Sequence, residues 1–368
     1  MILGVAFVWF TTHFGGGFAS GAQIYSYYVR YGIWSLFLPL FAMAYNGVFF
    51  AYCLYFARKH EVYDYRSYNN AFYGRFAPLF SNLFELLYLC VMCVAPAVAF
   101  ATGGATLSTL TGLPYLLCTF LIGAFIFVVS VFGTDLVRKV ASVLSICIIA
   151  GLLIVYVPNI IAGAGKIGDT VNAMKTADLP FGKALYAAFL YGTFQLANVA
   201  VFVQHAKSFE RPQDAGKSMA VGAVLNALLM IMVVLGIMTV YQNPEMSQQS
   251  VPTLFMVQQG VGSKFMTPLI SVLIILGAVS TAVNMVAAMV KRIHAGLAKR
   301  SGKPETAGSI SRTQILAALA CCIADFLIAQ LGLLTLIQRA YSILAYLAIP
   351  VILVPYVVHM IATRFDTK

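Results

Sequence analysis

Long apolar stretches recur along the whole chain, separated by short polar connectors. A stretch of about 20 apolar residues matches the ~30 Å hydrocarbon thickness of a bilayer, so each one predicts a membrane-spanning helix. The apolar residues run continuously instead of alternating, which excludes a β-barrel. We predict an all-α polytopic membrane protein with ten spans, over 2–28, 31–57, 77–102, 115–134, 138–162, 183–205, 216–241, 264–290, 313–331 and 336–361.

Composition and charge support and orient these spans. Of the 368 residues, 61% are hydrophobic and 10% are charged, with a mean hydropathy of +0.88. With the N-terminus placed in the cytoplasm, 17 of the 23 Lys and Arg residues fall on the inner side and 6 on the outer side. This bias predicts that both termini are cytoplasmic. The net charge of +11 thus reflects membrane orientation, and we expect no nucleic-acid partner.

Two of the predicted spans carry glycine and polar residues at their centres. The first contains TTHFGGGFASGAQ (11–23), and the sixth contains LYGTFQLAN (190–198). Broken membrane helices occur where the freed backbone faces protein or a cavity. Matching interruptions in two halves predict an inverted five-plus-five repeat, with helices 1 and 6 unwound at mid-membrane around a binding site. The alternative for the first span is that its glycines let another helix pack closely.

The repeat also predicts the domain organisation. The first five-helix repeat would cover 1–162, an outer connector 163–182, and the second repeat 183–368, all within one integral membrane domain. The basic segment 291–303 is interpreted as the most basic inward loop, with an anionic-lipid contact as the alternative.

The eighth span adds hydroxyl groups near its middle. Ser280 and Thr281 are adjacent in VSTAVN (279–284). Hydroxyl and carbonyl oxygens are the ligands that a dehydrated alkali cation requires. The alternative is a hydroxyl that bonds back to the carbonyl four residues earlier.

The string GGGFASGAQI (15–24) resembles the GAGFASGQE signature of the YkvI-type bacterial membrane proteins. These belong to the amino acid–polyamine–organocation superfamily, whose members have the LeuT-type five-plus-five fold. The resemblance extends over the whole chain in span count and topology. It implies a multi-pass transporter of the bacterial cytoplasmic membrane. Two departures stand out: Ala22 and Gln23 replace the Gln-Glu of the signature, and His13 replaces an apolar or small residue.

The resemblance also implies positions for the ligands. A solute would lie between the first and sixth spans, beside the third and eighth. Its expected contacts are His13, Gly15, Gly16, Gly17, Ser20, Gln23, Tyr191, Thr193, Gln195 and Asn198. A sodium ion would be bound by the backbone carbonyls near Thr11 and Phe14, the Gly277 carbonyl, and the hydroxyls of Ser280 and Thr281.

Few ionisable residues fall inside the spans, and those few are candidates for coupling or gating. Glu85 is interpreted either as a proton carrier or part of the inner gate, or as a structural residue that forms an ion pair or a hydrogen bond to a neighbouring hydroxyl. Asp325 and Arg339 are expected to pair with each other. His13 could be a proton site or could satisfy the unwound backbone. The seven cysteines are expected to act as small packing residues.

We therefore predict an ion-coupled symporter for a small zwitterionic or amine solute, an amino acid or a related compound. Sodium is the expected coupling ion, with a proton as the alternative, and no cofactor is expected. The expected partners are the solute and the lipid bilayer, with a monomer as the functional unit. The same fold would also suit a proton-coupled or uncoupled exchanger, or a sensor. An intramembrane hydrolase using Ser20 and His13 is disfavoured, because seven helical residues separate them by about 10 Å.

Overall fold

Helices make up all the regular secondary structure in the computed structural model, which describes residues 2–177, 179–301 and 311–366. Over those ranges, eight helical segments are long and apolar enough to cross a bilayer. A ninth results if the bent pair Ile146–Ala162 and Ala164–Thr176 forms one span. The molecule is therefore a polytopic helical membrane protein, as the hydropathy pattern predicts.

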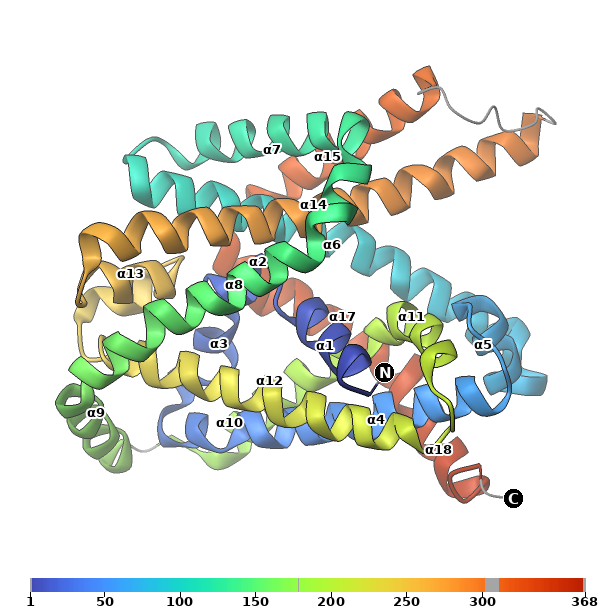
Figure 1. Cartoon of the computed structure of the whole chain (residues 1–368), viewed down its shortest axis with the longest axis horizontal. Coiled ribbons are helices and arrows are strands. Elements are labelled where there is room, and N and C mark those ends of the chain that lie inside the picture. The colour runs from blue at the N-terminus through green and yellow to red at the C-terminus, as the bar shows by residue number, and fades with distance from the viewer. Residues whose placement is uncertain (1, 178, 302–310, 367–368) are drawn as a thin grey trace.

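The eight segments include one or more labelled helices each (Figure 1). They contain α4 (Leu38–Lys59), α5 (Tyr65–Tyr73) with η2 (Gly74–Phe76) and α6 (Ala77–Thr111), α7 (Tyr115–Phe132), α10 (Phe181–Gln195) with η3 (Leu196–Asn198), α11 (Val199–Phe202) and η4 (Val203–Ser208), α12 (Asp214–Met238), α14 (Ser263–Ser301), α15 (Arg312–Ala329), and α16 (Leu333–Thr335) with η6 (Leu336–Ala340), α17 (Tyr341–Ala348), η7 (Ile349–Leu353) and α18 (Val354–Ala362).

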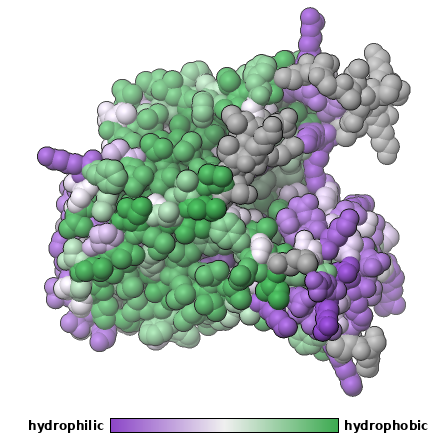
Figure 2. Space-filling model, viewed as in Figure 1, coloured by the Kyte–Doolittle hydropathy of each residue, from purple (hydrophilic) through white to green (hydrophobic). Residues whose placement is uncertain are grey.

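The surface agrees with a membrane location. Figure 2 shows an apolar band across the molecule, with hydrophilic residues gathered toward its two ends. Many large apolar side chains are exposed in this structure, including Leu3, Phe132 and Ile361. In water such a surface would be unfavourable, whereas in a bilayer it contacts acyl chains of similar polarity.

The first predicted span is broken into three short helices, α1 (Ile2–His13), α2 (Gly16–Ala19) and α3 (Ala22–Tyr27). The chain leaves the helical conformation at Phe14 and Gly15, and again at Ser20 and Gly21. At the second break Gly21 has a φ of 77°, in the left-handed region that favours glycine. The Ser20 carbonyl there accepts a hydrogen bond from the Thr253 N–H at 3.0 Å, so this part of the break is satisfied by protein.

The sixth predicted span is not unwound, which corrects the expectation for this segment. After α10 the chain tightens into the 3-10 turn η3 and stays in right-handed helical conformation. Gly192 lies inside α10, and a Cβ there would come within 2.6 Å of the Tyr45 ring. The glycine therefore allows α10 to pack closely on α4, which is the role small residues commonly have in membranes.

Two predicted connectors are largely helical. The segment 163–182 contains α9 (Ala164–Thr176), bent by 76° from α8 (Thr134–Ala162), and the segment 242–263 contains η5 (Pro244–Gln248) and α13 (Pro252–Gln258). The span predicted to end at 290 continues to Ser301 in α14. Its extension is rich in Lys, Arg, Ala and Leu, which are strong helix formers, so the helix persists beyond the apolar part.

The helices form two groups with the broken first segment between them (Figure 1). In one group α4 packs against α10 and α12, and in the other α14 packs against α6, α8 and α15. Helix α1 contacts α12, while α2 contacts both α14 and α6. The interrupted segment thus bridges the two groups, and the candidate site lies at this bridge. A further 3-10 segment, η1 (Val29–Leu36), joins α3 to α4.

Candidate functional site

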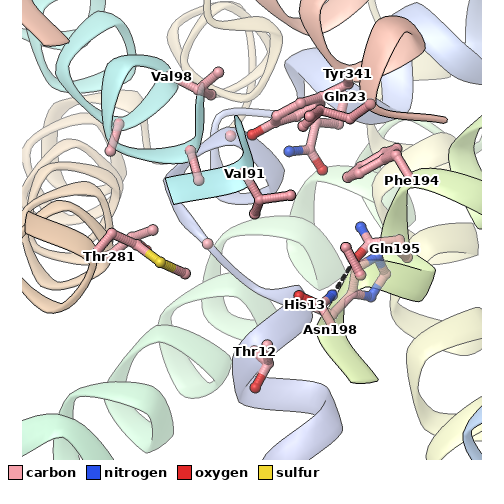
Figure 3. A pocket seen from close by; sticks show the side chains of 17 residues that line it. Thr12, His13, Gln23, Val91, Val98, Phe194, Gln195, Asn198, Thr281 and Tyr341 are labelled. Atoms are coloured by element: carbon pink, nitrogen blue, oxygen red, sulfur yellow. Dashed lines mark hydrogen bonds between the residues drawn. The ribbon is translucent and has the colours of Figure 1, made fainter. Parts of the chain in front are cut away.

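A cavity of about 100 Å³ lies beside the first break of the α1–α3 segment (Figure 3). Its walls come from all three helices of the α1–α3 segment and the first break between them, from α6, from the α10–η3 junction, from α14 and from α17. Six of the ten predicted solute contacts line it: His13, Gly15, Gly17, Gln23, Gln195 and Asn198. The structure therefore brings together the glycine-rich segment and LYGTFQLAN, although they are far apart in the sequence.

His13 has a partner on each ring nitrogen. Its Nδ1 lies 2.7 Å from Asn226 Oδ1, and its Nε2 lies 2.5 Å from the Tyr191 hydroxyl. The Asn226 amide nitrogen donates to the Gly222 carbonyl, so its oxygen must accept from His13. His13 therefore carries its proton on Nδ1, and Tyr191 donates to Nε2. The side chain is only 4% exposed, so this arrangement satisfies a buried imidazole.

Amide side chains supply most of the remaining polar lining. The Asn198 amide donates to Gln195 Oε1 at 2.7 Å, which fixes both groups on the η3 side. Gln23 is 6% exposed, and its Oε1 has no hydrogen-bond partner among the described residues. Buried carbonyl oxygens nearly always have a hydrogen-bond partner. The unpaired Gln23 oxygen is therefore an acceptor that a molecule in the cavity could use.

The other predicted solute contacts hold the surrounding backbone. The Ser20 hydroxyl donates to the Gly17 carbonyl at 2.8 Å, and the Thr193 hydroxyl donates to the Phe189 carbonyl at 2.7 Å. Gly16 is the first residue of α2. Tyr191 is fully buried and acts on the cavity through His13. These four residues lie next to the cavity but are not part of its lining.

The predicted sodium ligands come from two segments that contact each other, the first break of the α1–α3 segment and α14. A Cβ on Gly15 would come 3.4 Å from Thr281 Oγ1, so the first break of the α1–α3 segment packs directly on α14. The break also redirects two amides, because the Gly15 N–H donates to the His13 carbonyl and the Phe18 N–H donates to the Gly15 carbonyl. The carbonyls of Thr11 and Phe14 thereby lose the donors that a continuous helix would give them.

On α14 one of the two hydroxyls bonds back to the helix, which is the alternative considered for them in the sequence. The Thr281 hydroxyl donates to the Gly277 carbonyl at 3.0 Å, as a membrane-helix threonine commonly does. This bond uses the hydroxyl hydrogen and leaves the lone pairs of Thr281 Oγ1 available. Thr281 also lines the cavity, whereas Ser280 and Gly277 do not.

Glu85 forms an ion pair with Arg292 of α14. Tyr65 of α5 donates to Glu85 at 2.5 Å and accepts from Arg292 at 2.6 Å. The guanidinium also lies over the rings of Tyr65 and Tyr88, at 5.3 and 5.2 Å from their centroids. The structural ion pair considered for Glu85 is therefore present, and it ties α5, α6 and α14 together away from the cavity.

The expected pairing of Asp325 with Arg339 was wrong. Asp325 is 4% exposed within α15, whereas Arg339 is exposed in η6, and no ion pair joins them in this part of the described chain. The sequence places both residues near the same membrane face, but helix packing turns them toward different surroundings. Neither residue lines the cavity.

Several residues of the site were missed in the sequence. Asn226 was overlooked although it is an isolated amide inside an apolar span, which is a recognisable sign of a contact between helices. Val91 and Val98 of α6, Met285 of α14 and Tyr341 of α17 also line the cavity. These are ordinary residues of apolar spans, and the sequence carries no sign that separates them from their neighbours.

No protein-family model matches this chain, and no curated protein matches it either. Among the residues that the structure describes, no group of three or more His, Cys, Asp or Glu side chains could hold a metal ion. The polar side chains that line the cavity are those of Thr12, His13, Gln23, Gln195, Asn198, Thr281 and Tyr341.

Proposed function

We propose that this chain is an ion-coupled secondary transporter for a small zwitterionic or amine solute, an amino acid or a close relative. It would act by alternating access in a ten-helix, five-plus-five arrangement in the bacterial cytoplasmic membrane, with both termini inside. The observation that carries the proposal is the cavity beside the first break of the α1–α3 segment, which several polar side chains line. Such discontinuous helices commonly form the solute sites of transporters.

The size of the cavity favours a small solute. At about 100 Å³ it is smaller than the ~150 Å³ cavity that accommodates benzene in an engineered protein. A solute of about five or six non-hydrogen atoms, the size of glycine or alanine, would suit this space.

The lining favours a solute without net charge. No Asp, Glu, Lys or Arg is found among the described residues that form the cavity walls. Of the two proposed solute classes, a cationic amine would be buried without a charged side chain to pair with it, which is strongly unfavourable, so the lining favours the zwitterion. A zwitterion carries both charges, and its ammonium group could donate to the unused Gln23 oxygen. The rings of Phe194 and Tyr341 stack 4.5 Å apart and provide an apolar wall.

The proposed coupling ion is sodium, bound between the first break and α14. The freed carbonyls of Thr11 and Phe14 and the Thr281 hydroxyl are suitable neutral oxygen ligands. A proton taken up at His13 is the alternative, since His13 lines the same cavity. An intramembrane hydrolase is not favoured, because Ser20 donates to a backbone carbonyl and both nitrogens of His13 have other partners.

Uptake into proteoliposomes tests this proposal. We expect radiolabelled glycine or alanine to accumulate when a sodium gradient is imposed. Thr281→Ala should weaken the apparent sodium affinity by at least about tenfold, because losing one oxygen that faces a charge costs about 1.5–3 kcal/mol. Ser271→Ala is the matched control: this buried hydroxyl of α14 also bonds back four residues, to Thr267, but does not line the cavity.

The outcomes separate the alternatives. Full sodium dependence in Thr281→Ala would contradict the proposed ion site. Accumulation driven only by a pH gradient would favour proton coupling. Binding of the solute without any accumulation would favour a sensor, and neither binding nor uptake of any small amino acid or amine would contradict the proposed function.

A further inference from the structure

A second cavity, of about 190 Å³, lies between the end of α7, the α14 helix and the beginning of α15. These three helices contact one another, and they are drawn together in the upper part of Figure 1. The polar residues that line the cavity are Ser130, Lys291 and Gln314. This cavity shares no lining residue with the cavity at the first break of the α1–α3 segment.

Ser130 provides a hydroxyl that the protein leaves unused. Its side chain is only 8% exposed, and its Oγ has no hydrogen-bond partner among the described residues. Thr119 in the same helix instead donates to the carbonyl four residues earlier, at 2.8 Å. Since buried hydroxyls nearly always have a partner, the unpaired Ser130 hydroxyl indicates that a ligand or water completes this site.

One cationic residue, Lys291, lines the same cavity as the hydroxyl. The exposed Lys291 forms no ion pair within the described chain, whereas its neighbour Arg292 is paired with Glu85. The 18-residue helix α15 begins beside the cavity, with Ser311 and Gln314 forming its capping box. The capping box already satisfies the N–H groups of Ser311 and Gln314, so this helix end favours an anion through its dipole. No Asp or Glu is found among the described residues that line the cavity.

The cavity borders a surface that suits lipid. Val128 and Phe132 on α7 and Leu316 on α15 are 51%, 69% and 64% exposed, and each lies within two positions of a lining residue in the sequence. An acyl chain could therefore lie against these side chains while a headgroup enters the cavity. A soluble anion would gain nothing from this apolar rim.

We propose that this cavity binds the phosphate of an anionic phospholipid. The Ser130 hydroxyl would donate to a phosphate oxygen, and Lys291 together with the beginning of α15 would supply the positive charge. Because Lys291 is on α14, which also carries Thr281, the lipid would be held by the same helix that forms one wall of the first cavity. The proposal does not depend on transport activity.

Lipid binding to the purified, delipidated full chain tests the proposal. Native mass spectrometry would compare phosphatidylglycerol with phosphatidylcholine of identical acyl chains. We expect phosphatidylglycerol to bind at least about fivefold more tightly than phosphatidylcholine. Lys291→Gln should weaken the binding of phosphatidylglycerol about fivefold. Ser130→Ala should weaken it by about threefold, the effect of losing one hydrogen bond at the weak end of the usual range.

Lys217→Gln is the matched control, since Lys217 is another exposed lysine near a helix beginning, 3.9 Å from Asp214. This variant should bind phosphatidylglycerol as the native chain does. Equal affinity of the native chain for the two lipids would overturn the proposal without any variant. Equal losses in Lys291→Gln and Lys217→Gln would also overturn it. Displacement of the lipid by inorganic phosphate at about 10 mM, where screening is weak, would overturn it too, because a free anion would then fill the site without acyl chains.

Discussion

His13 is the residue whose role depends most on its surroundings. Its imidazole bridges α1, α10 and α12 through Tyr191 and Asn226, and it faces the cavity as well. The Asn226 amide is itself held by the Gly222 carbonyl, so the chain of donors runs in one direction. The pattern of bonds therefore determines which nitrogen of His13 carries the proton.

A double-mutant cycle on His13 and Asn226 tests this contact. Asn226→Leu leaves the Nδ1 proton buried without an acceptor, and we expect it to destabilise the protein by about 1–3 kcal/mol. The coupling energy between His13→Leu and Asn226→Leu should be about 0.6 kcal/mol, and at most about 1.7 kcal/mol, as for other hydrogen bonds between membrane helices. Unfolding of the four proteins in detergent gives the measurement. If the two substitutions change the free energy of unfolding additively, the contact between His13 and Asn226 is contradicted.

At the scale of elements, the two interrupted spans differ in kind. The first has true breaks, where Phe14 and Gly15 leave the helix and Gly21 takes a left-handed conformation. The sixth only tightens into a 3-10 turn, and its Gly192 serves close packing on Tyr45. A break of the first kind frees carbonyls for ligands, whereas a 3-10 turn keeps most backbone groups paired.

At the second break of the α1–α3 segment, the cost of the close contact with Thr253 can be separated from the cost of the left-handed backbone. Gly21 and Gly112 have nearly the same φ, 77° and 72°, but a Cβ on Gly21 would come 2.7 Å from Thr253 Oγ1, while a Cβ on Gly112 would meet nothing within 4 Å. Gly112→Ala should cost about 1–2 kcal/mol from the left-handed conformation alone. Gly21→Ala should cost a further 1–3 kcal/mol or so from overpacking.

Thermal unfolding of both variants in the same detergent checks this difference. Equal midpoints for Gly21→Ala and Gly112→Ala would contradict the close contact with Thr253. In that case the second break would not be held against α13.

At the scale of the whole molecule, contacts between distant segments define two opposite ends. Thr170 of α9 donates to the Met238 carbonyl, at the end of α12. Helix α12 has 25 residues, so its beginning lies about 36 Å away at 1.5 Å per residue. At that other end of the molecule, Asp366 pairs with Lys59 at 3.2 Å and with His60 at 2.9 Å, which joins the C-terminal turn to the end of α4.

Cysteine accessibility tests the predicted orientation of these ends. In a background without native cysteines, we expect Lys166→Cys on α9 to react with an impermeant thiol reagent in intact cells. Lys217→Cys, near the beginning of α12, should react only after the membrane is permeabilised, because the charge bias places that end in the cytoplasm. The opposite labelling pattern would invert the topology, and labelling of both positions in intact cells would contradict a spanning arrangement of α12.

The sequence by itself determined the class of the protein and the position of its first interruption. A membrane helix satisfies its own backbone hydrogen bonds, so its length and apolarity can be recognised from local residues alone. The glycines at 15–17 act locally as well, and the chain does leave the helix at Gly15.

Only the tertiary structure decided which groups meet. It gave His13 its partners Asn226 and Tyr191, paired Glu85 with Arg292, and separated Asp325 from Arg339. It also kept the sixth span helical, with Gly192 packed closely on α4. The physical reason is the same in each case: these contacts join helices far apart in the chain, and they depend on which faces pack together and in which register.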